Sequence, residues 1–275
     1  MGMKLKDTIK QLTPPVLIQA ATRLRAPVYD LSGDYRSWDE AMAASTGYDS
    51  DVILEKTRLA LLAVKNGEAA YERDSVLFDE IEYSWPLLAG LMWVAARCGG
   101  MLNVLDYGGS LGSTYFQNRV FLSALPDVRW NIVEQPRHVQ VGKACFEDDR
   151  LRFYADIRDC LAETQPNVVL FSSVLQYLER PYTVLDQVLA LPCEHVIIDR
   201  TPFWTGAEDR LCVQTVPPSI YSASYPGWIF SRQGFQSHLE KDWQCIVTFG
   251  SSDRLVGPVD VVYQGGVFVR RSQPS

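Results

Sequence analysis

The sequence predicts an α/β fold in which a largely parallel sheet carries helices on both faces. After residue 100, short apolar runs alternate with segments of helical spacing, which is the pattern typical of parallel sheets. One of these runs leads directly into a glycine-rich turn followed by a helix, at Asp106–Ser113. Before residue 100 the apolar spacing is helical, which predicts an N-terminal helical extension.

Length and composition fit one globular core with an appended segment. The chain has 275 residues, of which 47% are apolar and 21% charged, so it can bury a sizeable core. We divide it into a helical segment and cap at 1–99 and a ligand-binding domain at 100–275. The formal net charge of -7 argues against nucleic acid as a partner, because nucleic-acid affinity depends on Lys and Arg. A small-molecule or glycan partner is expected instead.

Metal sites, disulfides and membrane spans are not predicted. The six cysteines lie far apart without a C-x-x-C pair, so reduced structural thiols are expected and no metal ligands. No apolar stretch reaches the ~20 residues of a transmembrane segment, and no signal peptide is visible, so a cytoplasmic location is expected. Residues 1–25 are basic and amphipathic, and we expect them to pack on the core. The alternative is a weak peripheral contact with an anionic membrane surface.

Two helices are predicted before the sheet. Apolar residues at helical spacing give the first a face of Val52, Ile53, Leu59, Leu62 and Ala63, and the second a face of Leu87, Leu88, Leu91, Met92 and Val94. Gly99-Gly100 is expected to end the second helix. The loop between the helices is aromatic, with Phe78, Tyr83, Trp85 and Pro86. It either caps a site or packs as ordinary apolar surface.

The strands of the predicted sheet recur along the rest of the chain. They are expected at Leu102–Asp106, Trp130–Glu134, Leu151–Tyr154, Val168–Phe171, His195–Asp199, Ile246–Phe249 and Gly266–Arg270. The last two are expected to form a closing, hairpin-like pair. Helices are predicted at Thr183–Leu191 and Ser231–Glu240, and another begins near Ser113.

The glycine-rich turn carries the most specific signal in the sequence. Its spacing differs from the G-x-G-x-x-G of nicotinamide-binding proteins. It resembles the acid-x-Gly-x-Gly-x-Gly motif of class I S-adenosylmethionine-dependent methyltransferases, with Asp106, Gly108 and Gly112 in the matching positions and Ser110 in place of the middle glycine. The resemblance implies a Rossmann-like, seven-stranded methyltransferase sheet over about residues 100–271. It also implies S-adenosyl-L-methionine as the cofactor.

The same resemblance implies a set of cofactor-binding residues at successive strand ends. The acid of the turn would organise the loop and the methionine ammonium, and Glu134 would accept hydrogen bonds from the ribose hydroxyls. An acid after the third strand would take the adenine amino group, with an apolar neighbour stacked on the ring. The full set is Asp106, Gly108, Gly109, Ser110, Gly112, Glu134, Gln135, Asp156, Ile157 and Ser172.

The expected reaction is methyl transfer to a small-molecule or glycan-type acceptor, at oxygen. The turn, taken together with Phe78–Pro86, resembles bacterial methyltransferases associated with surface-polysaccharide biosynthesis. An N-P-P-Y element, used by enzymes that methylate base nitrogens, does not follow the fourth strand. This argues against nucleic-acid amines as acceptors.

Three residues are candidates for a catalytic role. His138 follows Glu134 closely and is a candidate base, because imidazole titrates near neutrality. Arg200 follows Asp199 at the carboxyl end of the fifth strand, where open α/β sheets bind ligands. Tyr177 is the third candidate. For the acceptor cleft, aromatic walls are expected from Tyr177, Trp204, Tyr221 and Trp228, unless these rings pack in the core.

Two other classes of function compete with a methyltransferase. Gly108–Gly112 also satisfies the G-x-S-x-G elbow of α/β-hydrolases, with Ser110 as nucleophile and Asp199 and His238 following in the hydrolase order. That interpretation leaves the acids at the three strand ends without a role. The other alternative is a non-catalytic cofactor-binding module, because a fold does not determine a function.

Overall fold

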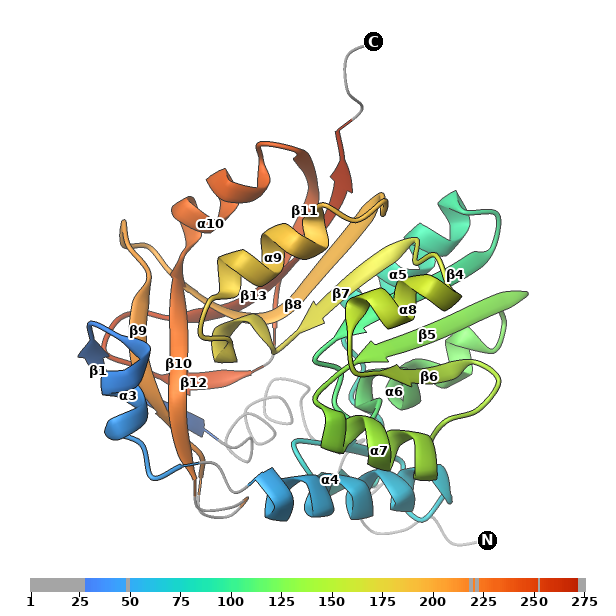
Figure 1. Ribbon diagram of the computed structural model, residues 1–275, viewed down its shortest axis with the longest axis horizontal. Helices are drawn as coiled ribbons and strands as arrows, with labels where there is room; N and C mark the ends of the chain where they lie inside the picture. Colours follow the sequence, from blue (N-terminus) through green and yellow to red (C-terminus); the bar gives the residue numbers. More distant parts are fainter. Residues whose placement is uncertain (1–27, 48–49, 218–219, 221–222, 252, 272–275) are drawn as a thin grey trace, which may run out of the picture.

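The computed structural model describes residues 28–47, 50–217, 220, 223–251 and 253–271. The expected packing or membrane contact of residues 1–25 and the expected role of Tyr221 lie outside these residues. Eleven of the described strands form one sheet, and two more form a separate hairpin (Figure 1). Among the described helices, none has the length and apolar character needed to cross a membrane.

Seven strands make up the core of the sheet, in the order β6-β5-β4-β7-β8-β13-β11. They are β4 (Met101–Tyr107), β5 (Asp127–Val133), β6 (Leu151–Tyr154), β7 (Val168–Ser172), β8 (His195–Trp204), β11 (Trp243–Gly250) and β13 (Val262–Arg270). The first five run parallel, and β13 is antiparallel to both β8 and β11. The predicted Rossmann-like α/β fold with seven core strands is confirmed, including the closing antiparallel pair.

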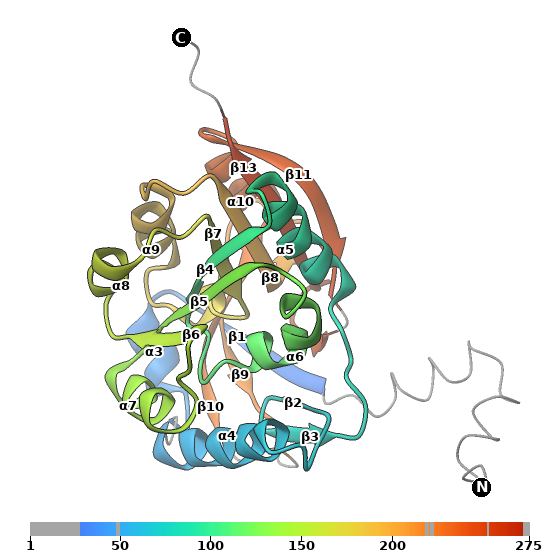
Figure 2. The same ribbon diagram turned by 90° about the vertical axis from the view of Figure 1, so that its right-hand side faces the viewer.

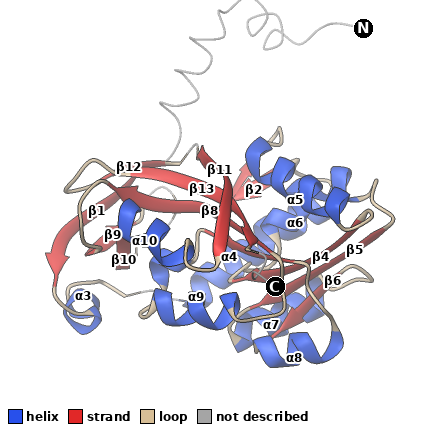
Figure 3. Ribbon diagram, turned by 90° about the horizontal axis from the view of Figure 1, so that it is seen from above, coloured by secondary structure: helices blue, strands red, loops and turns tan. Residues whose placement is uncertain are grey.

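Helices cover both faces of this core, as Figures 2 and 3 show. One face packs on α5 (Trp85–Arg97), α6 (Ser113–Leu122) and α7 (Pro136–Cys145), and the other on α8 (Ile157–Glu163), α9 (Pro181–Leu189) and α10 (Arg232–Leu239). Helix α4 (Ser50–Lys65) packs on α6 and α7. Alternation along each strand divides the buried side chains between the two layers. Val104, for example, joins the first cluster and Leu105 the second.

Four further strands extend the sheet beyond β8 and form what we call the wing. Their order outward from β8 is β10 (Ser224–Ser231), β9 (Arg210–Thr215), β1 (Val28–Tyr35) and β12 (Arg254–Val256). The sequence did not predict them. β10 contains Pro226 and Gly227, and β1 contains Gly33, which are residue types that weaken a strand pattern. Pairing with neighbours distant in sequence forms these strands nonetheless.

The N-terminal region supplies strands as well as helices. It contains α3 (Trp38–Ala43), α4, the hairpin of β2 (Tyr71–Arg73) and β3 (Val76–Phe78), and α5. Because β1 pairs with β9 and β12, residues on both sides of the proposed 99/100 boundary share one sheet. The domain division itself remains a prediction.

The predicted helices are present, but the buried face of α4 was predicted wrongly in part. Val52 and Leu59 are 49% and 54% exposed, whereas Leu54, Leu61 and Val64 are buried. The helix contacts both α6 and α7, so its buried stripe is turned relative to the simple apolar spacing. The face predicted for α5 is largely buried, and Gly99 and Gly100 follow its end with φ of 65° and 90°.

Candidate functional site

A cavity of about 760 Å³ opens at the carboxyl ends of β4, β5 and β7. The sheet order reverses between β4 and β7. From β4, the strands β5 and β6 follow on one side of the sheet, and β7 and β8 follow on the other side. Open α/β sheets bind ligands at such a switch point. The opposite wall comes from α4, the β2–β3 hairpin and the wing. The cavity therefore lies between the core sheet and the elements added to it.

The wall formed by the ends of the core strands is called here the glycine half. It consists of Asp106, Tyr107, Gly108, Gly109, Ser110, Glu134, Gln135, Ala155 and Ser172. Gly108 has φ of 70°, and a Cβ added to it would overlap the Val174 side chain beyond β7. A Cβ on Gly109 would overlap the carboxylate of Asp106. Close backbone packing thus requires both glycines.

Asp106 lies at the floor of the glycine half and is 1% exposed. Its Oδ2 accepts a hydrogen bond from Trp130 Nε1 at 2.9 Å, whereas its Oδ1 has no partner among the described residues. Burial raises the pKa of the Asp106 carboxyl; the Trp130 hydrogen bond lowers it and the nearby Glu134 carboxylate raises it, and the net pKa is about 7. A buried carboxylate with a free oxygen is costly, so a bound cationic or N–H group would stabilise this site.

The other predicted cofactor residues divide into two groups. Glu134, Gln135 and Ser172 line the cavity together with the turn. Gly112, Asp156 and Ile157 are not among the lining residues. Gly112 is buried at the start of α6 with φ of 104°, and Asp156 caps α8 by accepting a hydrogen bond from the Arg158 backbone N–H at 2.6 Å. Ala155, directly before Asp156, is the residue of this segment that lines the cavity.

All three candidate catalytic residues line the cavity. His138 on α7 is 7% exposed, and its Nδ1 has no partner among the described residues. The Tyr177 hydroxyl donates to Gln214 Oε1 at 3.1 Å. Of the other predicted aromatic walls, Trp204 and Trp228 do not line the cavity, and their indole N–H groups donate to the carbonyls of Glu208 and Leu178.

A β-bulge in β8 brings Asp199 and Arg200 to the same cavity. The register between β13 and β8 shifts so that both residues stand opposite Gly265. Arg200 has φ of 51°, in the left-handed region that non-glycine residues seldom occupy. Neighbouring side chains of a regular strand point to opposite faces, but Asp199 and Arg200 both line the cavity.

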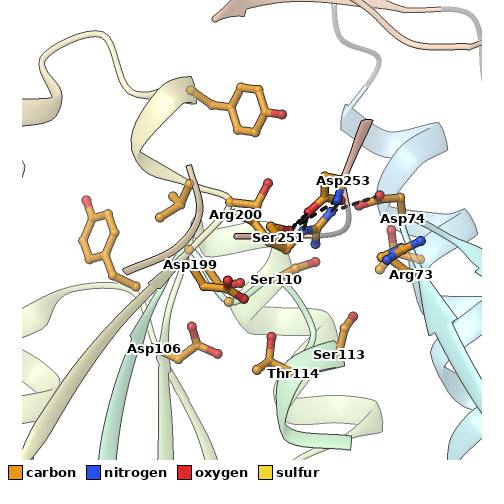
Figure 4. Close-up of a pocket in the computed structure, with 18 of the residues that line it drawn as sticks. Arg73, Asp74, Asp106, Ser110, Ser113, Thr114, Asp199, Arg200, Ser251 and Asp253 are labelled. Atoms are coloured by element: carbon orange, nitrogen blue, oxygen red, sulfur yellow. Dashed lines mark hydrogen bonds and ion pairs between the residues drawn. The ribbon is translucent and has the colours of Figure 1, made fainter. Parts of the chain in front are cut away.

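Arg200 is held between two carboxylates (Figure 4). Its Nε and Nη2 donate to Asp253 at 3.0 and 3.1 Å, and Nη2 also donates to Asp74 at 3.3 Å. Burial alone would raise the pKa of Asp253, but the Arg200 charge and a hydrogen bond from Ser251 hold it below its usual range. Tyr29 donates to the same Asp74 oxygen at 2.7 Å. The charge of Arg200 is therefore already neutralised within the protein.

The wall around this network is called here the tyrosine half. It consists of Tyr29, Tyr71, Glu72, Asp74, Tyr177, Arg200, Tyr225, Asp253 and Tyr263. Glu72 is 1% exposed and accepts hydrogen bonds from the Ser75 backbone N–H at 3.1 Å and from the Ser113 hydroxyl. Burial raises the pKa of Glu72 to about 7. Most of these residues were not singled out from the sequence, because strands and loops distant in sequence bring them together.

The hydrolase alternative does not find its triad in the structure. His238 lies on α10, with its Nε2 2.6 Å from Asp186 Oδ1, and it is not among the cavity-lining residues. Asp199 and Ser110 do line the cavity, but the only histidine that joins them among the described residues is His138. The predicted combination of Ser110, Asp199 and His238 is therefore wrong.

The strand order, the reversed strand β13 and the cavity at the switch point define a Rossmann-like α/β protein with a ligand site at the carboxyl edge of its sheet. No family model matches the chain, and no curated protein matches it.

Several solved structures resemble the fold at low identity. The N-terminal domain of EvdMO1, solved in the presence of SAH and D-fucose, is 13% identical with a TM-score of 0.48, covering 82% of this chain and 98% of that one. Magnesium protoporphyrin IX methyltransferase (ChlM) from Synechocystis PCC 6803, with bound SAH, is 13% identical with a TM-score of 0.44, covering 68% and 82%. Mitomycin 7-O-methyltransferase MmcR is 18% identical with a TM-score of 0.40, covering 67% and 54%. At such values, function rests on the site itself.

Proposed function

We propose that this protein is an S-adenosyl-L-methionine-dependent methyltransferase that acts on a small-molecule or glycan-type hydroxyl group. The observation that carries the proposal is the buried Asp106 at the glycine turn, whose Oδ1 has no partner among the described residues. A ligand with an ammonium group would supply the missing donor and the compensating charge. The position of the turn at the switch point, with Glu134 on the next strand end, supports the same ligand.

The residues present fit this cofactor. Asp106 and the turn would hold the methionine portion, Glu134 would accept from the ribose hydroxyls, and the segment Ala155–Ile157 would lie toward the adenine. When bound, the cofactor supplies an electrophilic methyl group on a sulfonium. The protein then has to hold donor and acceptor in line and exclude water. The enclosing walls from α4, the β2–β3 hairpin and the wing are placed to do this.

The finer expectations from the sequence belong to this proposal. They are methylation at oxygen, a link with surface-polysaccharide biosynthesis and a cytoplasmic location. His138 stays in the proposal as one of two candidate bases in the cavity wall, the other being Asp199, because it is buried and its Nδ1 has no partner among the described residues. A non-catalytic module with the same pocket is the competing function. It would bind the cofactor but transfer no methyl group to any acceptor.

Calorimetric titration with S-adenosylhomocysteine (SAH) tests the proposal directly. We expect binding at micromolar concentrations, with one site per chain. Adenosine alone should bind more weakly, because it lacks the ammonium that Asp106 would accept. No heat and no thermal stabilisation at millimolar SAH would reject the proposal.

A further inference from the structure

Charge in the cavity excludes one kind of acceptor. Its described lining contains seven carboxylates against two arginines: Glu72, Asp74, Glu82, Asp106, Glu134, Asp199 and Asp253 face Arg73 and Arg200. Both arginines are already paired, Arg73 with Glu82 at 3.4 Å and Arg200 with Asp74 and Asp253. A phosphate or carboxylate on the acceptor would therefore find no free arginine in the described wall and would face repulsion.

The side chains of the tyrosine half suit the binding of an uncharged ring. Seven of the 13 tyrosines of the chain line the cavity. Tyr177 and Tyr225 stack edge to face with ring centroids 5.3 Å apart, and Gln214 bridges their hydroxyls by accepting from Tyr177 and donating to Tyr225 at 3.1 and 3.2 Å. Rings fixed in this way offer an apolar surface, and the carboxylates of the cavity wall accept hydrogen bonds. The C–H faces and hydroxyls of a sugar match both.

Asp199 is the acidic residue of the β8 bulge, and it forms no ion pair with another described residue. It is 2% exposed, and its Oδ1 has no hydrogen-bond partner among the described residues. Ser172 stands opposite it on β7, and in the view of Figure 4 Asp199 lies between Asp106 and the Arg200 network. It thus stands at the boundary between the glycine half and the tyrosine half. That is where the two reacting groups would meet.

Resting on the methyltransferase function proposed above, we propose that the tyrosine half is an acceptor subsite for an uncharged, hydroxyl-bearing sugar ring and that Asp199 Oδ1 takes the proton of the methylated hydroxyl. The acceptor oxygen forms the new bond to carbon, the carbon–sulfur bond breaks with its electron pair left on sulfur, and the hydroxyl proton passes to Asp199. The products are the methyl ether, SAH and a neutral Asp199, which returns its proton to solvent.

The electrostatics of Asp199 suit this role. Burial raises its pKa, the Arg200 charge lowers it and the Asp253 carboxylate raises it, and the net pKa is about 6. The group is therefore ionised at neutral pH, yet basic enough to accept a proton. An amine acceptor fits less well, because surrounding carboxylates stabilise its protonated, non-nucleophilic form. A sugar hydroxyl stays neutral at physiological pH.

The first experiment measures which acceptors bind, without turnover. Protein saturated with SAH is titrated with the methyl glycosides of glucose, galactose and mannose, and with the matched uronates and 2-amino sugars, by saturation-transfer NMR and calorimetry. We expect at least one neutral glycoside to bind, and its uronate to bind at least tenfold more weakly. A uronate that binds as well as its neutral partner, or SAH binding with no neutral glycoside bound, would overturn the subsite. Absence of SAH binding would instead remove the underlying function.

The second experiment tests Asp199 through Asp199→Asn, with Asp186→Asn as the matched change on an exposed pair outside the cavity. The wild type and both variants are assayed at saturating cofactor with the best glycoside from the first experiment. We expect the kcat of the wild type to rise with pH near 6, as Asp199 ionises. In Asp199→Asn, kcat should be about 100-fold lower and should lack this rise. SAH affinity should stay within twofold, and Tm should be equal or higher, because a neutral amide replaces a buried carboxylate.

Other outcomes of the second experiment count against the assignment. A kcat reduced less than tenfold, or SAH affinity and Tm falling together with kcat, would show that Asp199 is structural. Transfer to the nitrogen of an amino sugar in preference to any hydroxyl would replace the hydroxyl acceptor by an amine. Asp186→Asn should match the wild type in all these measurements.

Discussion

The two halves of the cavity are built in different ways. The glycine half comes from the ends of consecutive core strands, and its turn is a single stretch from Asp106 to Gly112. The tyrosine half combines β1, the β2–β3 hairpin, the turn Leu175–Tyr177, the β8 bulge, β10, the segment that precedes β12, and β13. Residues that are adjacent in the chain can be recognised as a motif, whereas residues assembled by long-range pairing leave no such pattern. The expected cofactor wall was therefore visible in the sequence and the proposed acceptor wall was not.

The largest expected effect comes from Gly108→Val, which tests how rigidly the glycine half is packed. The new side chain would meet Val174 and would have to adopt φ near 70°. We expect a loss of about 3 kcal/mol or more in unfolding free energy and a Tm lower by roughly 10 °C. The matched control is Gly67→Val, because Gly67 has φ of 79° and nothing within 4 Å of an added Cβ. Equal losses in the two variants would show that packing against Val174 contributes nothing.

Glu134→Ala should empty the glycine half selectively. Glu134 is only partly buried, so its removal should change Tm little, whereas losing a charged acceptor for two hydroxyls costs about 1.5–3 kcal/mol. Calorimetry should therefore show SAH affinity weaker by about tenfold to a hundredfold. Glu179→Ala, on the surface outside the cavity lining, is the control and should bind SAH like the wild type. Unchanged affinity in Glu134→Ala would exclude Glu134 from the site.

The pH dependence of SAH affinity tests whether Asp106, in the glycine half, is the group that titrates. Because its pKa is raised to about 7, the carboxyl is protonated in the free protein below that pH and must lose a proton to pair with an ammonium. SAH affinity should therefore rise as pH increases through about 7, by several-fold between pH 6 and pH 8. Asp106→Asn should bind more weakly and lose this dependence, although Glu72 and Asp199 still titrate nearby. A slope that persists in Asp106→Asn would assign the titration to the tyrosine half.

The smallest effect is expected for Ser110→Ala. The serine is only half-buried and has φ of 52°, a conformation that alanine shares at similar cost. SAH affinity and Tm should change by no more than about 0.5 kcal/mol and a few degrees. A fluorophosphonate probe should not label Ser110 in the wild type. Labelling that disappears in Ser110→Ala, together with esterase activity, would restore the hydrolase.

The core sheet was predictable because its signals are local. Buried parallel strands are short apolar runs, and the run at Leu151–Tyr154 coincides with β6. The wing was missed because Pro226, Gly227 and Gly33 interrupt its strands. In the site, the turn was recognisable from its spacing. Glu72 was not recognisable from the sequence. Its burial depends on how the three-residue strand β2 packs against α6, and this contact leaves no local pattern.

The bulge at Asp199 and Arg200 has a consequence for the whole strand that carries it. One extra residue inverts the parity of the side chains that follow, so positions after the bulge face the layer opposite to the one that the first half of β8 would assign them. The alternation of side chains between the two faces of the sheet is therefore reversed at the point where the wing begins. Removing one residue there would restore regular alternation and exchange the inner and outer faces of Thr201–Trp204. The wing, which pairs with this part of β8, would then present its opposite face to the cavity.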